Sequence, residues 1–188
     1  MPIIHRCAIE GRVLSTMKRY AVLPLRAIIG AGFIQHGWSK IAKGPDAFAG
    51  ILQALHVPFA HLTAYLTISV ELLGGAAFLA GAFVVWVSVP SIFVLLTAMF
   101  TVHLPYGFSS IKIKGIVDGR AQFGPPGYEC DLLYIAGMLT LVFLGSGPWS
   151  VDDYRLRRRL GRVVENFCGW RSNFVTKRTI SPRYDNIS

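Results

Sequence analysis

The sequence predicts an all-α membrane protein: a bundle of four transmembrane helices followed by a C-terminal amphipathic helix at the membrane surface. The chain of 188 residues is 53% hydrophobic and only 15% charged, whereas soluble domains carry about 25% charged residues. Residues 62–102 contain no Lys or Arg and a single acidic residue, Glu71. This stretch is about twice the roughly 20 residues that cross a bilayer. These observations exclude a soluble fold, a disordered chain and a disulfide-stapled secreted domain.

Four apolar segments are the expected spans. They cover about residues 20–38, 62–80, 83–102 and 132–144, and the short fourth segment is extended back to residue 128 and forward to Trp149. Gly81 marks a tight turn between the second and third spans, and Pro90 is tolerated inside the third because neighbouring helices satisfy the freed carbonyl. The chain is thus divided into a basic N-terminal segment (1–19), a four-helix membrane domain (20–149) and a basic tail (150–188).

The basic tail is expected to begin with a helix on the inner leaflet. Ser150 and Asp153 have the spacing of a capping box. Apolar residues then recur among arginines at roughly helical spacing, which is typical of an interfacial amphipathic helix: Val151, Tyr154, Leu160, Val163, Val164 and Phe167. We expect the tail to attract a bilayer with anionic lipids.

Charge distribution predicts the orientation. Of the 19 Lys and Arg residues, four precede residue 20 and nine follow residue 154, whereas the loops 39–61 and 103–130 together hold five. By the positive-inside rule, both termini are cytoplasmic and the protein is a multi-pass protein of the cell (inner) membrane. No nucleic-acid-binding motif accompanies the basic residues, so nucleic acid is not an expected partner.

Two charged residues fall inside the expected spans. Arg26 lies in the first span and Glu71 near the middle of the second. Each charge inside a span costs at least about 2.5–3.5 kcal/mol on insertion scales, so each needs a partner or a purpose. We predict an Arg26–Glu71 ion pair, which either locks two helices in register or acts as a relay for protons or a quinone headgroup.

A second polar group is expected where three helix ends meet on the outward side. His36 and Lys40 are four residues apart and therefore share one face of the first helix. The other members end the third span or open the fourth: His103, Tyr128, Glu129 and Asp131. Interfacial His and Tyr also serve as simple membrane anchors.

The three cysteines form no Cys-x-x-Cys pair, and no haem, flavin or metal motif is evident, so we expect no metal site.

Four sequence patterns resemble the DoxX family of small four-helix membrane proteins. They are Leu25-Arg26-x3-Gly30-x2-Phe33-x2-His36-Gly37-x2-Lys40, Glu71-x2-Gly74-Gly75-x3-Leu79-x-Gly81, Gly127-Tyr128-Glu129-x-Asp131-Leu132-Leu133-Tyr134 and Gly145-x-Gly147-x2-Ser150-x-Asp152. The resemblance runs from about Pro24 to Asp152. The chain departs from the family in Trp149, in a lengthened loop at 111–120 and in the basic extension after Asp152.

The resemblance implies a membrane subunit of a quinone-linked or stress-related redox complex, similar to the small subunit of thiosulfate:quinone oxidoreductase. In that reading Glu71, Arg26 and His36 are the candidate catalytic residues, and quinone is the cofactor. The candidate residues for substrate or quinone binding are Lys40, His103, Tyr128, Glu129 and Asp131. A redox partner subunit and a homo-oligomer are the expected protein partners. Two alternatives stay open: a non-catalytic scaffold that anchors a soluble oxidoreductase, and a transporter of small molecules or protons.

Overall fold

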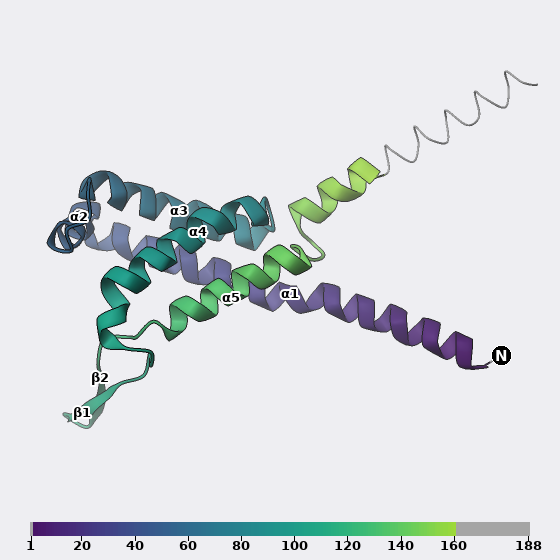
Figure 1. Cartoon of the computed structure of the whole chain (residues 1–188), viewed down its shortest axis with the longest axis horizontal. Helices are drawn as coiled ribbons and strands as arrows, with labels where there is room; N and C mark the ends of the chain where they lie inside the picture. Colours follow the sequence, from purple (N-terminus) through teal and green to yellow (C-terminus); the bar gives the residue numbers. More distant parts are fainter. Residues whose placement is uncertain (1, 161–188) are drawn as a thin grey trace, which may run out of the picture. The chain divides into compact units, whose positions relative to one another are not determined.

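The computed structural model describes residues 2–160, and the side chains of Met17 and of residues 19–160. Within this range the chain is mostly helical (Figure 1). The α-helices are α1 (Pro2–Lys43), α2 (Pro45–Ala54), α3 (Ala60–Ala80), α4 (Val84–Ala98) and α5 (Glu129–Leu144). A π-helical turn η1 (Met99–His103) and a 3-10 turn η2 (Leu104–Tyr106) continue α4, and a hairpin of β1 (Ile113–Val117) and β2 (Arg120–Phe123) precedes α5.

Two helical stretches, Ala60–Ala80 and Val84–Tyr106, are long and apolar enough to cross a membrane. Only 33% and 22% of their most apolar windows are buried inside the protein. Large apolar side chains such as Leu73, Trp86 and Phe93 are 72–77% exposed. The core helices of a soluble protein bury such residues, so this exposure favours a lipid environment for both stretches.

Each predicted span coincides with a helix over its central residues, but the bounds of the helices differ from those of the predicted spans. The second and third spans begin within two residues of α3 and α4, whereas α1 extends the first span in both directions, to Pro2 and Lys43. The extension of the fourth span to Trp149 is wrong. Helix α5 ends at Leu144 because Gly145 and Gly147 adopt positive φ angles of 82° and 73° and Pro148 follows; neither conformation continues an α-helix.

Four helices pack in a closed ring: α1 contacts α3, α3 contacts α4, α4 contacts α5, and α5 contacts α1. A cluster of buried side chains lies between them, with Phe78 and Met138 fully buried at its centre. Helices α1 and α3 approach closely at two glycines: a Cβ atom built on Gly75 would lie 2.7 Å from the carbonyl oxygen of Gly30 and 2.9 Å from the amide nitrogen of Ile34.

The Gly30–Gly75 contact leads to a stability prediction. Gly75→Ala is expected to lower the free energy of unfolding by about 1–3 kcal/mol, since backbone atoms cannot yield to the added methyl group. Gly50→Ala is the matched control, because a Cβ atom at this helical position meets nothing within 4 Å. Denaturant titration of both variants in detergent micelles checks the prediction, and an equally stable Gly75→Ala variant would contradict it.

The turn between α3 and α4 is held from a distant part of the chain. Gly81 ends α3 with a φ angle of 62°, and its carbonyl accepts a hydrogen bond from the Asp152 amide at 3.1 Å. The Asp152 carboxylate accepts hydrogen bonds from the amides of Phe83 (2.9 Å) and Val84 (3.1 Å) at the start of α4, where a helix does not supply acceptors of its own. Asp152 therefore caps α4, a role the sequence did not reveal.

Both connecting loops contain structure that the sequence analysis left undescribed. Helix α2 begins with Pro45 and Asp46, which suit a first helical turn, and packs its buried Ala49 and Leu52 against the start of α3. The lengthened loop forms the antiparallel β1–β2 hairpin. Its two-residue turn is Asp118–Gly119, both with positive φ angles, as hairpins with primed turns require.

Residues 151–160 are helical, so the prediction of a helix opening after Ser150 is confirmed. Within the unit that starts at residue 153, the Arg157 guanidinium donates to the Asp153 carboxylate at 2.9 Å. The predicted apolar residues Val163, Val164 and Phe167 lie outside the described residues.

Candidate functional site

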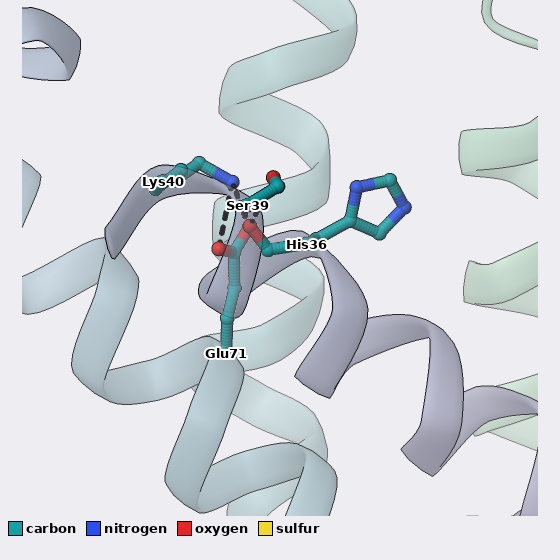
Figure 2. Close-up of polar contacts among 4 residues, drawn as sticks. All are labelled: His36, Ser39, Lys40 and Glu71. Carbon is teal, nitrogen blue, oxygen red and sulfur yellow. Dashed lines mark hydrogen bonds and ion pairs between the residues drawn. The ribbon is translucent and has the colours of Figure 1, made fainter. Parts of the chain in front are cut away.

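A buried ion pair inside the helical ring joins α1 to α3. The Lys40 ammonium donates to both carboxylate oxygens of Glu71 at 2.7 Å, and the two side chains are only 18% and 8% exposed (Figure 2). Gly37 makes this possible, since a Cβ atom there would lie 3.2 Å from the Cβ of Glu71. The ammonium also lies 5.1 Å from the centre of the Phe48 ring. Lys40 is thus enclosed by α1, α2 and α3.

The predicted Arg26–Glu71 ion pair is wrong, because the register of α1 against α3 differs from the one assumed. Glu71 lies level with Gly37. Arg26 precedes Gly37 by eleven residues, or about 16 Å along the helix axis. An arginine side chain cannot span that distance, so Lys40, one turn beyond Gly37, is the partner of Glu71.

Arg26 is bound at the opposite end of the ring. Its guanidinium donates to the carbonyl oxygens of Ser146 (2.6 Å) and Trp149 (3.2 Å), and the residue is 7% exposed. Gly81 leaves room for it, since a Cβ atom there would lie 2.6 Å from Nη1 of Arg26. Arg26 therefore fastens the segment after α5, which we call the strap (residues 145–152), to α1.

The π-helical turn η1 and helix α5 are joined by a second polar pair. Nδ1 of His103 lies 2.5 Å from Oδ2 of Asp131, with the side chains 25% and 7% exposed. The π-helical turn Met99–His103 carries the histidine to this position, and such turns often occur at functional sites. The expected meeting of the third and fourth helix ends is confirmed by this contact.

The third contact links α1 to α5. The rings of His36 and Tyr134 are 6.5 Å apart in an edge-on arrangement, and Figure 2 shows the His36 ring directed away from the Lys40–Glu71 pair. Tyr134 was absent from the predicted site, although its position three residues after Asp131 places both on one face of α5. Its hydroxyl lies against Gly32, where a side chain would collide with it.

These three contacts form one group, which we call the polar layer: Glu71, Lys40, His36, Tyr134, Asp131 and His103. Each contact joins two different helical elements of the ring, namely α1–α3, α1–α5 and η1–α5. Except for Tyr134, every member was a predicted site residue. The layer therefore places five of the eight candidates in one part of the fold.

Tyr128 and Glu129 lie at the base of the hairpin loop instead. The Tyr128 ring packs edge-on against Phe108 with centres 5.5 Å apart, and the Glu129 carboxylate accepts a hydrogen bond from the Ser110 amide at 3.0 Å. These contacts fasten the loop to the start of α5. Tyr128 and Glu129 therefore anchor the loop, a role that the sequence pattern did not distinguish from ligand binding.

The chemistry of the polar layer is that of hydrogen bonding and proton transfer. Among residues 2–160, no group of three or more His, Cys, Asp and Glu side chains is arranged to hold a metal ion. The layer offers an ammonium and an imidazole as donors, each beside a carboxylate. Such a set suits a small polar molecule with carbonyl or anionic oxygens.

Comparison with known proteins gives one match. Residues 21–104 match the family model described as DoxX. These residues run from the predicted first span through α3 and α4 to the end of η1 and include Arg26, the Lys40–Glu71 pair and His103. No curated protein and no solved structure matches the chain.

Proposed function

We propose that this chain, whose match to the DoxX family model over residues 21–104 supports membership of that family, is a membrane subunit of a quinone-linked redox complex. The observation that carries the proposal is the polar layer. It sets an ammonium–carboxylate pair and an imidazole–carboxylate pair among helices whose outer surfaces are apolar. A charged group at such a depth is expensive and is usually associated with a function.

The proposal requires that all four helices of the ring cross the membrane. Helices α3 and α4 have the length and hydropathy to do so. Helices α1 and α5 pack against each other and against one of these two spans each, so their lipid-facing surfaces lie at the same depth. The distribution of Lys and Arg supports an orientation with both termini on the cytoplasmic side, and in that orientation the polar layer lies toward the outer face.

The residues of the polar layer suit the headgroup of a quinone. When bound, a quinone accepts two electrons and two protons as it becomes a quinol, and its carbonyl oxygens accept hydrogen bonds. The Lys40 ammonium and the His103 imidazole are the donors for such oxygens, and Glu71 and Asp131 hold them in place. In this proposal a partner protein delivers the electrons, and His103–Asp131 passes protons at Nδ1 and Oδ2.

A scaffold that anchors a soluble oxidoreductase is the second candidate function. It is favoured by the completeness of the internal contacts: Glu71 is paired with Lys40, and Arg26 is bound by two carbonyl oxygens. Side chains with these partners stabilise helix register without any ligand. The two candidates differ in whether the polar layer binds a quinone.

Binding of a short-chain ubiquinone analogue to the purified protein in lipid nanodiscs tests the proposal. We expect saturable binding to the unmodified chain and an affinity at least tenfold lower in His103→Gln, because the neutral Gln amide donates a weaker hydrogen bond than a protonated imidazole beside a carboxylate. His61→Gln is the control, since His61 is exposed and its contact with Asp46 is 3.5 Å long.

Circular dichroism melting accompanies both variants, so that loss of fold is separated from loss of binding. Partitioning into lipid without a saturable component, in a folded unmodified chain, would overturn the redox proposal and favour the scaffold. Equal affinity in His103→Gln and the unmodified chain would remove His103 from the site.

A further inference from the structure

The β1–β2 hairpin is amphipathic, with an apolar face that nothing in the described chain covers. The register pairs Ile113 with Phe123 and Ile116 with Ala121. Residues directly opposite in a ladder share one face, and Ala121 and Phe123 are two apart on β2. The register shift between Ile113 and Gly115 brings Ile113 and Ile116 opposite these two residues, so all four side chains lie on the same face. Ile113, Ile116 and Phe123 are 73%, 77% and 60% exposed. Gln122 and Arg120 lie on the other face.

Positive charge surrounds this apolar face. The hairpin region carries Lys112, Lys114 and Arg120 against one acidic residue, Asp118. The Lys112 ammonium lies 5.7 Å from the centre of the Tyr106 ring, at the end of η2. Apolar side chains flanked by cations are typical of segments that lie at an anionic membrane surface.

The base of the hairpin lies between the end of η2 and the start of α5 and is held there by backbone hydrogen bonds. The span Val84–Tyr106 ends six residues before Lys112. The Gly124 amide donates to the Lys112 carbonyl at 2.7 Å, and the Gly127 amide donates to the Ser109 carbonyl at 3.1 Å. Exposed apolar side chains of the span, including Phe100 and Leu104, continue toward the loop. The hairpin is thus attached at a candidate membrane boundary.

We propose that the β1–β2 hairpin is a membrane-surface anchor: its apolar face enters the interface of the bilayer, and its cations bind anionic lipid headgroups. The inference rests on the membrane placement given under the proposed function, though not on quinone binding. An anionic bilayer is the occupant favoured by the charge and by the continuity with the apolar surface of α4 and η1. A protein partner or a second copy of this chain is the competing occupant.

Spin labels on single cysteines test the anchor in the full chain, with the native cysteines replaced by Ser and the protein placed in nanodiscs containing phosphatidylglycerol. The labels replace Ile116 on the apolar face, Gln122 on the polar face and Phe93 on α4 as a membrane reference. We expect the labels at 116 and 93 to collide more with oxygen than with a water-soluble nickel chelate. The label at 122 is expected to show the reverse.

The outcomes separate the hairpin from the membrane placement itself. If the label at residue 116 collides mainly with the nickel chelate while the label at residue 93 collides mainly with oxygen, the hairpin is not a membrane anchor although the spans lie in the bilayer. If the label at residue 116 is protected from both reagents, the anchor proposal is overturned and a protein covers the apolar face of the hairpin. Nickel access at 93 would contradict the membrane placement of α4. Replacing phosphatidylglycerol by phosphatidylcholine should lower oxygen access at 116, and no change would overturn the part assigned to the cations.

Discussion

Lys40→Met is expected to lower the free energy of unfolding by about 3–5 kcal/mol, the largest effect of any substitution considered for this chain. The variant leaves Glu71, 8% exposed, without its only charged partner within the described residues. An unpaired buried charge is far more costly than a buried pair is favourable. Glu71→Gln is expected to cost less, because the Lys40 ammonium is 18% exposed and its flexible stem can move it toward water.

The double variant Lys40→Met/Glu71→Gln should recover much of the loss, since no uncompensated charge remains. Unfolding of all four proteins, followed by circular dichroism in mixed micelles containing increasing amounts of SDS, completes a double-mutant cycle. Asp46→Asn is the matched control, because the Asp46–His61 pair is exposed and such pairs contribute about 0–1 kcal/mol. Additive losses in the cycle would show that the Lys40–Glu71 contact contributes nothing.

The same double variant separates the two candidate functions. Loss of saturable quinone binding in a stable double variant would support a role of the pair in the redox site. Unchanged quinone binding would assign the pair to helix register alone and leave His103–Asp131 as the remaining candidate within the polar layer.

Arg26→Met is expected to cost about 3 kcal/mol of unfolding free energy and to release the strap. The guanidinium donates to two carbonyl oxygens from a site that is 7% exposed. A hydrogen bond to a charged group contributes about 1.5–3 kcal/mol, and the carbonyls it leaves behind have no water to replace it. Hydrogen exchange at residues 145–152 measures the release, alongside unfolding in micelles.

Two variants serve as controls for Arg26. Lys43→Met removes a cation from an exposed position on the same helix and should change neither quantity. Arg26→Lys keeps the positive charge but replaces the planar guanidinium, which donates to two acceptors, with a compact ammonium group. This variant should therefore retain part of the stability. Full protection of the strap in Arg26→Met would show that its other contacts, including those of Asp152 and Trp149, are sufficient to hold it.

The hydropathy of the chain was sufficient to predict α3 and α4 because an uninterrupted apolar run longer than a bilayer has few other stable forms. It was also sufficient to select Glu71 and Arg26 as charged residues buried within the helical ring. The partner of each charge depended on the register of α1 against α3, which is set by the contact of Gly30 with Gly75. A sequence shows that both glycines are present, and it does not show that they face each other.

The two connecting loops failed to be predicted for a different reason. Strands β1 and β2 carry a recognisable signal, since Ile and Lys alternate over residues 111–114 and the turn dipeptide Asp118–Gly119 follows shortly after. This strand signal is short and much weaker than the hydropathy of the flanking spans. Tyr128 and Glu129 were selected as ligand-binding residues because Tyr and Glu at a helix start fit that role equally well. Their contacts with Phe108 and Ser110 depend on the path of the loop.

The Arg26 contact also has a consequence for biosynthesis. Its main acceptor, the Ser146 carbonyl, lies 120 residues further along the chain. At about 5–20 residues per second, a ribosome makes that acceptor roughly 6–24 s after Arg26. During this interval, a guanidinium without its acceptors must stay near water or within the insertion machinery. Burial of Arg26 against its acceptors is therefore expected to be among the last steps in assembly of the bundle, after the strap has been made.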